Sequence, residues 1–244
     1  MNIIKLHAID STNSFLKELA RKEPLPDFTV VTTQNQTAGR GQRGNGWYST
    51  AEGSLIFSVY KIFDHLPVIQ HFKISMMVSL ALIEAFQLFD IPEIKVKWPN
   101  DIMAGNKKIV GILVENNLMG EFITSSVIGI GINVSVKSFP DLPQAGSLSF
   151  SSDSVIIKEE LFQSILKSLG THLANLMNVR FEELKTLYEA HLFRKNVISV
   201  FEDPLSGKRF NAVIKGISSQ GELVIETDEG LMSQVGVKEL RLLF

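Results

Sequence analysis

A glycine-rich stretch, QTAGRGQRGNGW at residues 36–47, has the composition of an anion-binding loop. It holds four glycines and two arginines between two apolar runs. Glycine lets a ligand approach the backbone, free N–H groups bind anions, and arginine donates to phosphate or carboxylate oxygens. The spacing is not that of a Walker loop, and no helix follows to complete a dinucleotide-binding turn. Three alternatives remain: a flap over a small anionic ligand, an Arg-Gly tract that binds RNA, and a flexible loop without chemistry.

A second candidate is KWPND at residues 97–101. Pro99 is expected to end a strand and to leave Lys97, Asn100 and Asp101 together at its carboxyl end. An ammonium, an amide and a carboxylate at one turn suit a ribose, a phosphate and a divalent cation. The alternative is an ordinary Asx turn with Lys97 in solvent.

Two apolar stretches, KKIVGILVE (107–115) and IGIGINV (128–134), carry polar residues and glycines at particular positions. Strand alternation puts Lys107 and Lys108 on opposite faces, and a lysine that points inward needs an anionic partner. Gly111, three residues after Lys108, faces the other way in a regular strand, but a glycine there still allows close backbone contact, for instance at a bulge. Gly129 and Gly131 share one face with Asn133 and leave a slot for a flat ligand, unless a helix simply packs closely there.

The composition excludes several classes of site. The 244 residues contain no cysteine, so disulfides, thiolate nucleophiles and zinc–thiolate sites are ruled out, and the five histidines lack metal-ligand spacing. A net charge of −2 argues against broad binding to nucleic acid or acidic membranes. The apolar stretch 74–86 is too short to span a bilayer, and no basic-then-apolar leader opens the chain. We therefore expect a cytoplasmic protein without a membrane partner.

The hydrophobic pattern predicts an α+β fold, in which helices pack on a mixed or antiparallel sheet. Strands are expected over 2–9, 28–33, 54–61 and 94–98, with a hairpin over 107–117 and 121–135. Helices are expected over 11–22, 68–89, 154–177 and 181–191, and residues 135–153 read as a loop. From Val197 onward, short strands predict a small all-β module. We divide the chain into 1–194 and 195–244.

Five motifs occur in one order: DSTN (10–13), QTAGRGQRGNGW (36–47), KVKWPNDI (95–102), KKIVGILVE (107–115) and IGIGINV (128–134). Together they resemble the biotin protein ligases, also called biotin–[acetyl-CoA-carboxylase] ligases. The resemblance implies a class II synthetase-like catalytic domain followed by a small SH3-like β-barrel. It also implies that biotin and Mg²⁺·ATP form biotinyl-5′-AMP, from which biotin passes to a lysine of a biotin carboxyl carrier protein.

The resemblance assigns roles to residues of these motifs. Arg40 and Lys108 become the catalytic residues, which offset negative charge on the carboxylate or phosphate. The residues carried over to biotin are Ser11, Thr12, Asn13, Gln36, Gly39, Arg40, Gly41, Gln42, Lys108, Gly111, Gly129 and Gly131. Those carried over to the nucleotide are Arg43, Trp47, Lys97, Asn100, Asp101 and Asn133, with Asp101 also a ligand of Mg²⁺.

Some family members carry more arginines in the glycine loop, where this sequence has Gln42 and Asn45, so contacts to the outer phosphates of ATP are expected to be weaker or to come from elsewhere. Other members carry an N-terminal helix-turn-helix and repress transcription. Here the S-T-N motif starts at residue 11, which predicts a monofunctional ligase without sequence-specific DNA binding. We expect this ligase to be a monomer or a homodimer. The enzyme alternative is a lipoate-protein ligase of similar architecture.

Overall fold

The computed structural model describes residues 1–140, 142–151 and 155–244, and all of these side chains except that of Arg43. The start of the helix expected at 154 and part of the loop expected at 135–153 therefore lie outside the described residues.

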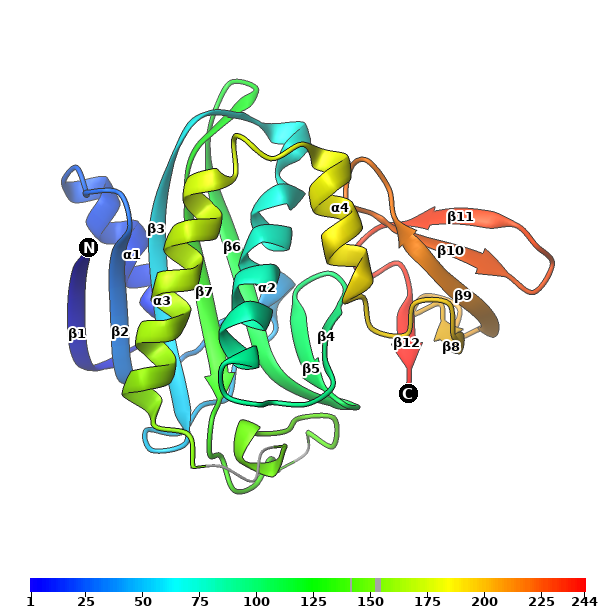
Figure 1. The fold of residues 1–244 in the computed structure, drawn as a ribbon, viewed down its shortest axis with the longest axis horizontal. Helices are drawn as coiled ribbons and strands as arrows, with labels where there is room; N and C mark the ends of the chain where they lie inside the picture. The colour runs from blue at the N-terminus through cyan, green and yellow to red at the C-terminus, as the bar shows by residue number, and fades with distance from the viewer. Residues whose placement is uncertain (141, 152–154) are drawn as a thin grey trace.

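The larger part of the chain is built on a seven-stranded sheet with the order β1-β2-β3-β7-β6-β5-β4 (Figure 1). The pair β1–β2 is parallel and every other neighbouring pair is antiparallel, which confirms the expected mixed sheet. The strands are β1 Asn2–Ile9, β2 Thr29–Gln36, β3 Ser54–Pro67, β4 Ile94–Lys97, β5 Asp101–Ala104, β6 Lys107–Met119 and β7 Phe122–Asn133.

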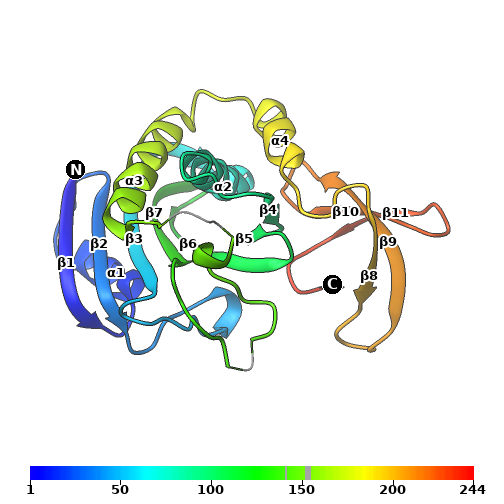
Figure 2. The same ribbon diagram turned by 60° about the horizontal axis from the view of Figure 1, so that its bottom comes forward.

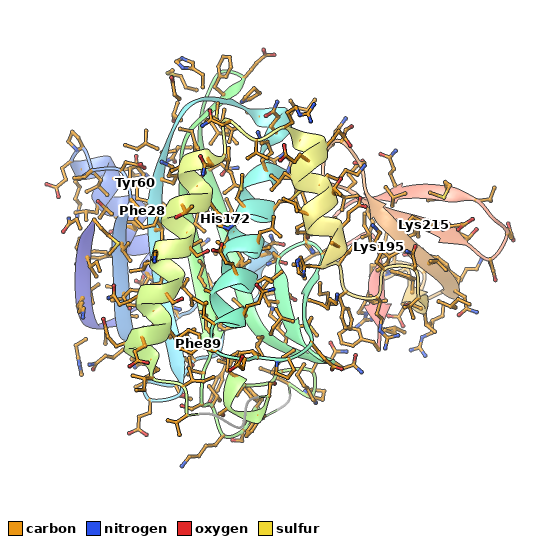
Figure 3. All side chains as sticks on the ribbon, viewed as in Figure 1. Phe28, Tyr60, Phe89, His172, Lys195 and Lys215 are labelled. Carbon is orange, nitrogen blue, oxygen red and sulfur yellow. The ribbon has the colours of Figure 1, made fainter. Side chains whose placement is uncertain are left out.

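Helices cover both faces of this sheet, unequally. The long helices α2 (Phe72–Gln87) and α3 (Lys158–Asn175), with α4 (Phe181–Ala190) beside them, cover one face, and α1 (Thr12–Lys22) lies on the other (Figure 2). The α2–α3 pair is tied by His172 Nε2 and Glu84 Oε2, 2.6 Å apart (Figure 3).

Alternation along β7 sorts its residues between the two faces. Ile128, Ile130 and Ile132 enter the main hydrophobic core under the long helices. Val127 packs on Leu16 of α1 on the opposite face. Gly129 and Gly131 share this second face because side chains two residues apart in a strand point the same way. The glycine face is thus the face that the long helices leave open, and α1 is the one helix of the described residues that lies on it.

The KWPND motif does not merely end a strand. Residues 98–100 form the tip of a hairpin in which β4 and β5 pair in antiparallel fashion, with Lys97 opposite Asp101. The sequence reading missed β5 because this strand has only four residues, and a single proline made the motif look like the end of an element. This hairpin places Lys97 and Asp101 opposite each other on neighbouring strands.

The final fifty residues form a second, five-stranded antiparallel sheet with the order β11-β10-β9-β8-β12, as the strand spacing predicted. Its strands are β8 Ile198–Glu202, β9 Arg209–Ile217, β10 Leu223–Thr227, β11 Met232–Val235 and β12 Arg241–Leu243. We call this sheet the C-terminal module. Trp98 Nε1 donates to Gly221 O at 2.8 Å, and Ile217 N donates to Glu189 Oε1 at 2.9 Å. The division between residues 194 and 195 stays a prediction.

One helical segment, residues 68–87, is long and apolar enough to cross a membrane by length and composition. It includes the stretch judged too short above, because a 3-10 turn over Val68–Gln70 precedes α2. Most of it is buried as the central helix of the core. Burial in a soluble core explains the same composition, so this segment is weak evidence for a membrane span.

Candidate functional site

A cleft of about 730 Å³ lies on the open face of the sheet and extends to the C-terminal module. Most of the residues predicted from the sequence line it: Ser11, Thr12, Asn13, Gln36, Arg40, Gly41, Gln42, Trp47, Lys97, Asn100, Asp101, Lys108, Gly111, Gly129 and Gly131. Gly39 and Asn133 are not among the lining residues, and the side chain of Arg43 is outside the description. Segments far apart in sequence therefore meet in one hollow.

One end of the cleft is formed by polar groups at the start of α1. Ser11 is the N-cap, and its hydroxyl accepts from Ser14 N, as expected for a helix that begins at Thr12. The amide oxygen of Gln36, at the end of β2, accepts from Thr12 N at 2.9 Å and from the Thr12 hydroxyl at 3.1 Å. The DSTN motif and the start of the glycine-rich stretch, which are separate in sequence, thus present one array of hydroxyl and amide groups.

The side chain of Asn13 is held by partners on two different strands, β3 and β6. Its Oδ1 accepts from the Ser58 hydroxyl at 2.6 Å, and its Nδ2 donates to Glu115 Oε2 at 2.9 Å. Lys17 Nζ donates to the other oxygen of Glu115 at 2.7 Å. Burial raises the pKa of the Glu115 carboxyl, but the hydrogen bonds from Lys17 and Asn13 outweigh it and leave the pKa below its usual range. A charged Glu115 therefore fixes which way the Asn13 amide faces.

Lys108 lies at the centre of the cleft with its ammonium 2.7 Å from Asp101 Oδ1. The register of β5 and β6 shifts between Ile102 and Met103, which confirms the expected bulge. The shift means that β6 has one more residue than β5 at this point. For this reason both Lys108 and Gly111 face the cleft. Lys107 faces away, and its Nζ donates to Pro143 O at 2.6 Å. The inward lysine thus has the anionic partner that its burial requires.

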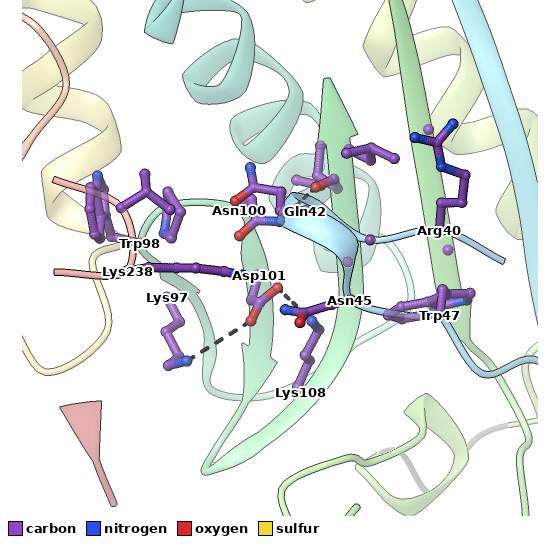
Figure 4. Close-up of a pocket in the computed structure, with 18 of the residues that line it drawn as sticks. Arg40, Gln42, Asn45, Trp47, Lys97, Trp98, Asn100, Asp101, Lys108 and Lys238 are labelled. Atoms are coloured by element: carbon purple, nitrogen blue, oxygen red, sulfur yellow. Dashed lines mark hydrogen bonds and ion pairs between the residues drawn. The ribbon is translucent and has the colours of Figure 1, made fainter. Parts of the chain in front are cut away.

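Lys97 faces the second oxygen of Asp101 at 4.0 Å and lies over the ring of Phe244, with Nζ 5.4 Å from the ring centroid. Burial lowers the pKa of the Lys97 ammonium; Asp101 opposes this effect and Lys108 adds to it. Two lysines share one carboxylate here, so this part of the cleft carries a positive charge that a phosphate would neutralise (Figure 4).

The backbone of Lys108 is also fixed. Lys108 N donates to Gln144 O at 2.7 Å, and Gly146 N donates to Lys108 O at 2.9 Å. Residues 144–146 therefore form a strap along β6 that fixes the main chain of Lys108 and, with it, the position from which its side chain enters the cleft. The Asn133 amide supports this strap, since its Nδ2 donates to Gly146 O at 3.0 Å.

The glycines of β6 and β7 do not leave a bare slot, contrary to expectation. A Cβ on Gly131 would lie 2.4 Å from Trp47 Cε2, and one on Gly111 would lie 2.7 Å from Trp47 Cζ3. A Cβ on Gly129 would lie 2.2 Å from Asn13 Oδ1. The missing side chains make room for the indole and the amide, so a ligand would contact Trp47 rather than the bare strands beneath it.

The glycine loop forms a small hairpin rather than an extended segment. Trp47 N donates to Gly39 O at 2.9 Å, and Gly41 N donates to Asn45 O at 2.7 Å. Gly39 is required where the two arms cross, because a Cβ there would lie 2.4 Å from Trp47 O. The hairpin sets Trp47 under Lys108, whose Nζ is 5.5 Å from the indole centroid, and Arg40 Nη1 donates to Ser14 Oγ at 3.3 Å.

A sequence model of the biotin/lipoate A/B protein ligase family matches residues 6–133, slightly more than half of the chain. This chain belongs to that family. The match covers the first four motifs and all but the last residue of the fifth, from the start of α1 to the end of β7.

Individual proteins to which this ligase is similar support the same family. It is 31% identical to the bifunctional ligase/repressor BirA of Bacillus spizizenii, over 94% of this chain and 71% of that protein. It is 29% identical to the biotin–[acetyl-CoA-carboxylase] ligase of Mycobacterium tuberculosis, over 88% of this chain and 80% of that one. A solved biotin protein ligase from Aquifex aeolicus, in complex with biotin and ATP, is 27% identical with a TM-score of 0.79, covering 99% of this chain and 98% of that one.

The donors of this ligase do not suit a resident metal ion. Lys108 and Lys97 already face the two oxygens of Asp101, and no cluster of three histidine or acidic side chains exists among the described residues. Mg²⁺ ligands are typically carboxylates free of such cations together with phosphate oxygens. These contacts favour a Mg²⁺ ion that arrives with the nucleotide as part of the substrate, and the role of Asp101 as a Mg²⁺ ligand stays a prediction.

Two asparagines predicted for the nucleotide have structural partners. Asn100 Nδ2 donates to Ile112 O at 2.7 Å and holds the hairpin against β6. Asn133 is buried beside the strap, and its Oδ1 has no hydrogen-bond partner among the described residues. Their contacts with a nucleotide remain predictions.

Sequence reading missed three residues of this ligase's site: Ser58, Glu115 and Lys238. Ser58 and Glu115 orient the start of α1 from behind, and Lys238 reaches the cleft from the C-terminal module. Only Glu115 left a signal, because a carboxylate in an apolar strand demands a partner. The other two meet the site through tertiary structure alone.

Proposed function

We propose that this protein is an ATP-dependent biotin protein ligase of the cytoplasm. The observation that carries the proposal is the position of Lys108, between the polar array at the start of α1 and the cationic hairpin of β4 and β5. A carboxylate held at the array would meet a phosphate at Lys108. The family relationship and the biotin- and ATP-bound structure from Aquifex aeolicus support the same pair of substrates.

In the first half-reaction, a biotin carboxylate oxygen bonds to the α-phosphorus of Mg²⁺·ATP, and pyrophosphate leaves with the electrons of the broken P–O bond. Ser11, Thr12, Asn13 and Gln36 orient the ureido and thiophene end of biotin. The ammonium of Lys108 offsets the negative charge that gathers at phosphorus, and a fixed donor is most effective there because it needs no reorganisation. Asp101 and the strap hold that donor in place.

In the second half-reaction, the free amine of an acceptor lysine bonds to the acyl carbon of biotinyl-5′-AMP. The C–O bond to AMP breaks, AMP leaves, and the nitrogen loses a proton. The adenylate reacts with water, so the hairpin of residues 39–47 acts as a cover over the mixed anhydride. The acceptor is the biotin carboxyl carrier domain of a carboxylase.

The decisive experiment is mass spectrometry of a biotin-acceptor domain incubated with this protein, biotin and Mg²⁺·ATP. The expected product carries one biotinyl group on a single lysine. An unmodified acceptor, under conditions in which a known ligase modifies it, would refute the proposal.

A lipoate-protein ligase is the second candidate, since the family includes both activities. ATP–pyrophosphate exchange with biotin or lipoate as the only acid separates them, and exchange with lipoate alone would favour the second candidate. RNA binding through the glycine loop is less well supported, because Arg40 lines the cleft and bonds to Ser14. The lack of sequence-specific DNA binding stays a prediction, for which a mobility-shift assay is the check.

A further inference from the structure

A chain of hydrogen bonds connects a partly buried carboxylate to the polar end of the cleft. From Glu115 on β6 it passes to Asn13 and then to Ser58 on β3. From Ser58 it continues to Thr12 and ends at Gln36. We call these five side chains the relay. Thr12, Asn13 and Gln36 line the cleft, whereas Ser58 and Glu115 are not among its lining residues.

The relay is largely closed to water. Ser58 is fully buried, and Thr12 and Asn13 are only 2% and 3% exposed. Buried polar groups of this kind are normally hydrogen-bonded. Each member of the relay therefore depends on its neighbours, or on a bound ligand, for its hydrogen bonds.

The carboxylate end of the relay fixes the direction of the Asn13 amide. Burial raises the pKa of the Glu115 carboxyl, but hydrogen bonds from Lys17 and Asn13 outweigh this effect, so the group is ionised at neutral pH. An ionised carboxylate accepts hydrogen bonds and cannot donate them. It therefore faces Asn13 Nδ2, at 2.9 Å, and leaves Oδ1 to face Ser58. The other partner of Nδ2, Leu113 O, is 3.4 Å away and makes a weaker contact.

The direction of the Asn13 amide decides where the single proton of Ser58 goes. Two oxygens lie within reach of that hydroxyl, Asn13 Oδ1 at 2.6 Å and Thr12 Oγ1 at 2.7 Å. One proton cannot serve both, and the amide oxygen is the nearer and stronger acceptor. The proton of Thr12 itself points to Gln36 Oε1, at 3.1 Å. The Thr12 oxygen is thus left as an acceptor without a donor, on a residue that lines the cleft.

We propose that Glu115 and Ser58 are positioning residues that keep the Thr12 hydroxyl an acceptor, so that the cleft selects an acid whose ring carries N–H groups. This inference rests on the proposed ligase function and names the residues behind its choice of acid. The ureido ring of biotin has two N–H groups, and one of them fills the acceptor on Thr12. The ring of lipoate has none. A site built to bind an N–H group rejects a ligand without it, because the polar groups of the site are then left unpaired.

Lys17 offers a way to reverse the relay. Its ammonium can only donate, and it lies 2.7 Å from Glu115 Oε1. In Glu115→Gln, Lys17 should therefore hold the new amide oxygen and turn the new NH₂ group toward Asn13. Asn13 should then turn its oxygen to that group and its Nδ2 to Ser58. The Ser58 proton would pass to Thr12 and fill from behind the acceptor that the ligand needs.

The test is biotin-dependent ATP–pyrophosphate exchange. Glu115→Gln should raise the KM for biotin about tenfold, as for one buried donor left unsatisfied, without a change in kcat or in the KM for Mg²⁺·ATP. Addition of Lys17→Met should restore most of the loss, because the glutamine can then turn its oxygen to Asn13. In a Ser58→Ala background, Glu115→Gln should have no further effect, since the relay is already cut.

Glu18→Gln is the matched control, since it makes the same chemical change at an exposed residue of α1 that does not line the cleft. Thermal melting checks the fold of each variant. An unchanged KM for biotin in Glu115→Gln would overturn the inference, as would equal changes in the KM for ATP. A second substitution at Lys17 that deepens the loss would reveal a merely structural role and overturn it too, as would a full effect of Glu115→Gln without Ser58. Absence of biotin-dependent exchange in the unmodified protein would instead overturn the ligase function itself.

Discussion

The ammonium of Lys108 on β6 lies 2.7 Å from Asp101 Oδ1 on the neighbouring strand β5, and the pairing of these two strands contains a bulge. The same carboxylate faces Lys97 at 4.0 Å, so neither lysine has an anion of its own. An arriving phosphate can take up the unneutralised charge without either lysine leaving its position.

The Lys108→Ala variant should lose adenylation while it keeps its fold. We expect biotin-dependent ATP–pyrophosphate exchange to fall about 100- to 1000-fold, as for other donors to developing charge. Lys107→Ala is the control, because that lysine faces away from the cleft and should retain near-normal exchange. Thermal melting checks the fold of both proteins. Near-normal exchange in Lys108→Ala would remove this residue from the mechanism.

The Arg40→Ala variant should release the adenylate faster without a loss of stability. Arg40 is exposed on the hairpin, and its hydrogen bond to Ser14 is 3.3 Å long, so its contribution to folding is small. Retention of radiolabelled biotinyl-5′-AMP on rapid gel filtration measures the release, with Arg21→Ala as a control on the exposed end of α1. Equal retention by both variants would be evidence against a role for Arg40 in the cover.

The Gly131→Ala variant should be destabilised through Trp47 alone. The new Cβ would lie 2.4 Å from the indole, and overpacking of this kind costs about 1–3 kcal/mol. The cost should disappear when the same change is made in a Trp47→Ala background, where the space is open. Urea denaturation of the four proteins of this double-mutant cycle is the measurement. An equal cost in both backgrounds would show that the indole does not occupy the space above Gly131.

The charge on Glu115 should make stability depend on pH in a defined direction. The folded protein lowers the pKa of this carboxyl, so its stabilisation is present above the ordinary value of about 4.3 and is lost as the pH falls through the lower folded-state pKa. At pH 7 the parent should therefore unfold at higher urea than Glu115→Gln, and the difference should close below about pH 4. Glu121→Gln tests an exposed glutamate of the β6–β7 turn. A difference that persists unchanged at pH 3 would contradict the assignment.

Most of the fold could be predicted because its longer elements repeat hydrophobic residues clearly. The expected helices and strands exist, with ends shifted by a few residues, and β3 runs to Pro67 rather than stopping near residue 61. The hairpin of β4 and β5 was one exception, and the three-residue strand β12 of the C-terminal module was another. A four-residue strand carries too few positions for alternation to be recognised, and pairing across the sheet is not written in local sequence.

The site likewise has residues that could be predicted from the sequence and residues that could not. Motif residues such as Lys108 and Asp101 were predictable, since resemblance and charge both indicated them. The use made of the glycines was not, because only the folded chain shows that Trp47 and Asn13 fill the space above them. Lys238 was beyond reach for a related reason: an exposed lysine in a turn is ordinary until the fold brings that turn to a cleft.

The strap at residues 144–146 is hydrogen-bonded to Lys108 through main-chain atoms. A main-chain contact does not depend on which side chains the strap carries, but it does depend on how many residues the strap has. In a scanning library across 142–146, most replacements should therefore preserve biotinylation, apart from Gly146, where a Cβ would meet Lys107 at 2.5 Å. Removal of a single residue should abolish it, because the catalytic ammonium would then sit at a different elevation over the indole. In this part of the enzyme, the number of residues should matter more than the identity of their side chains.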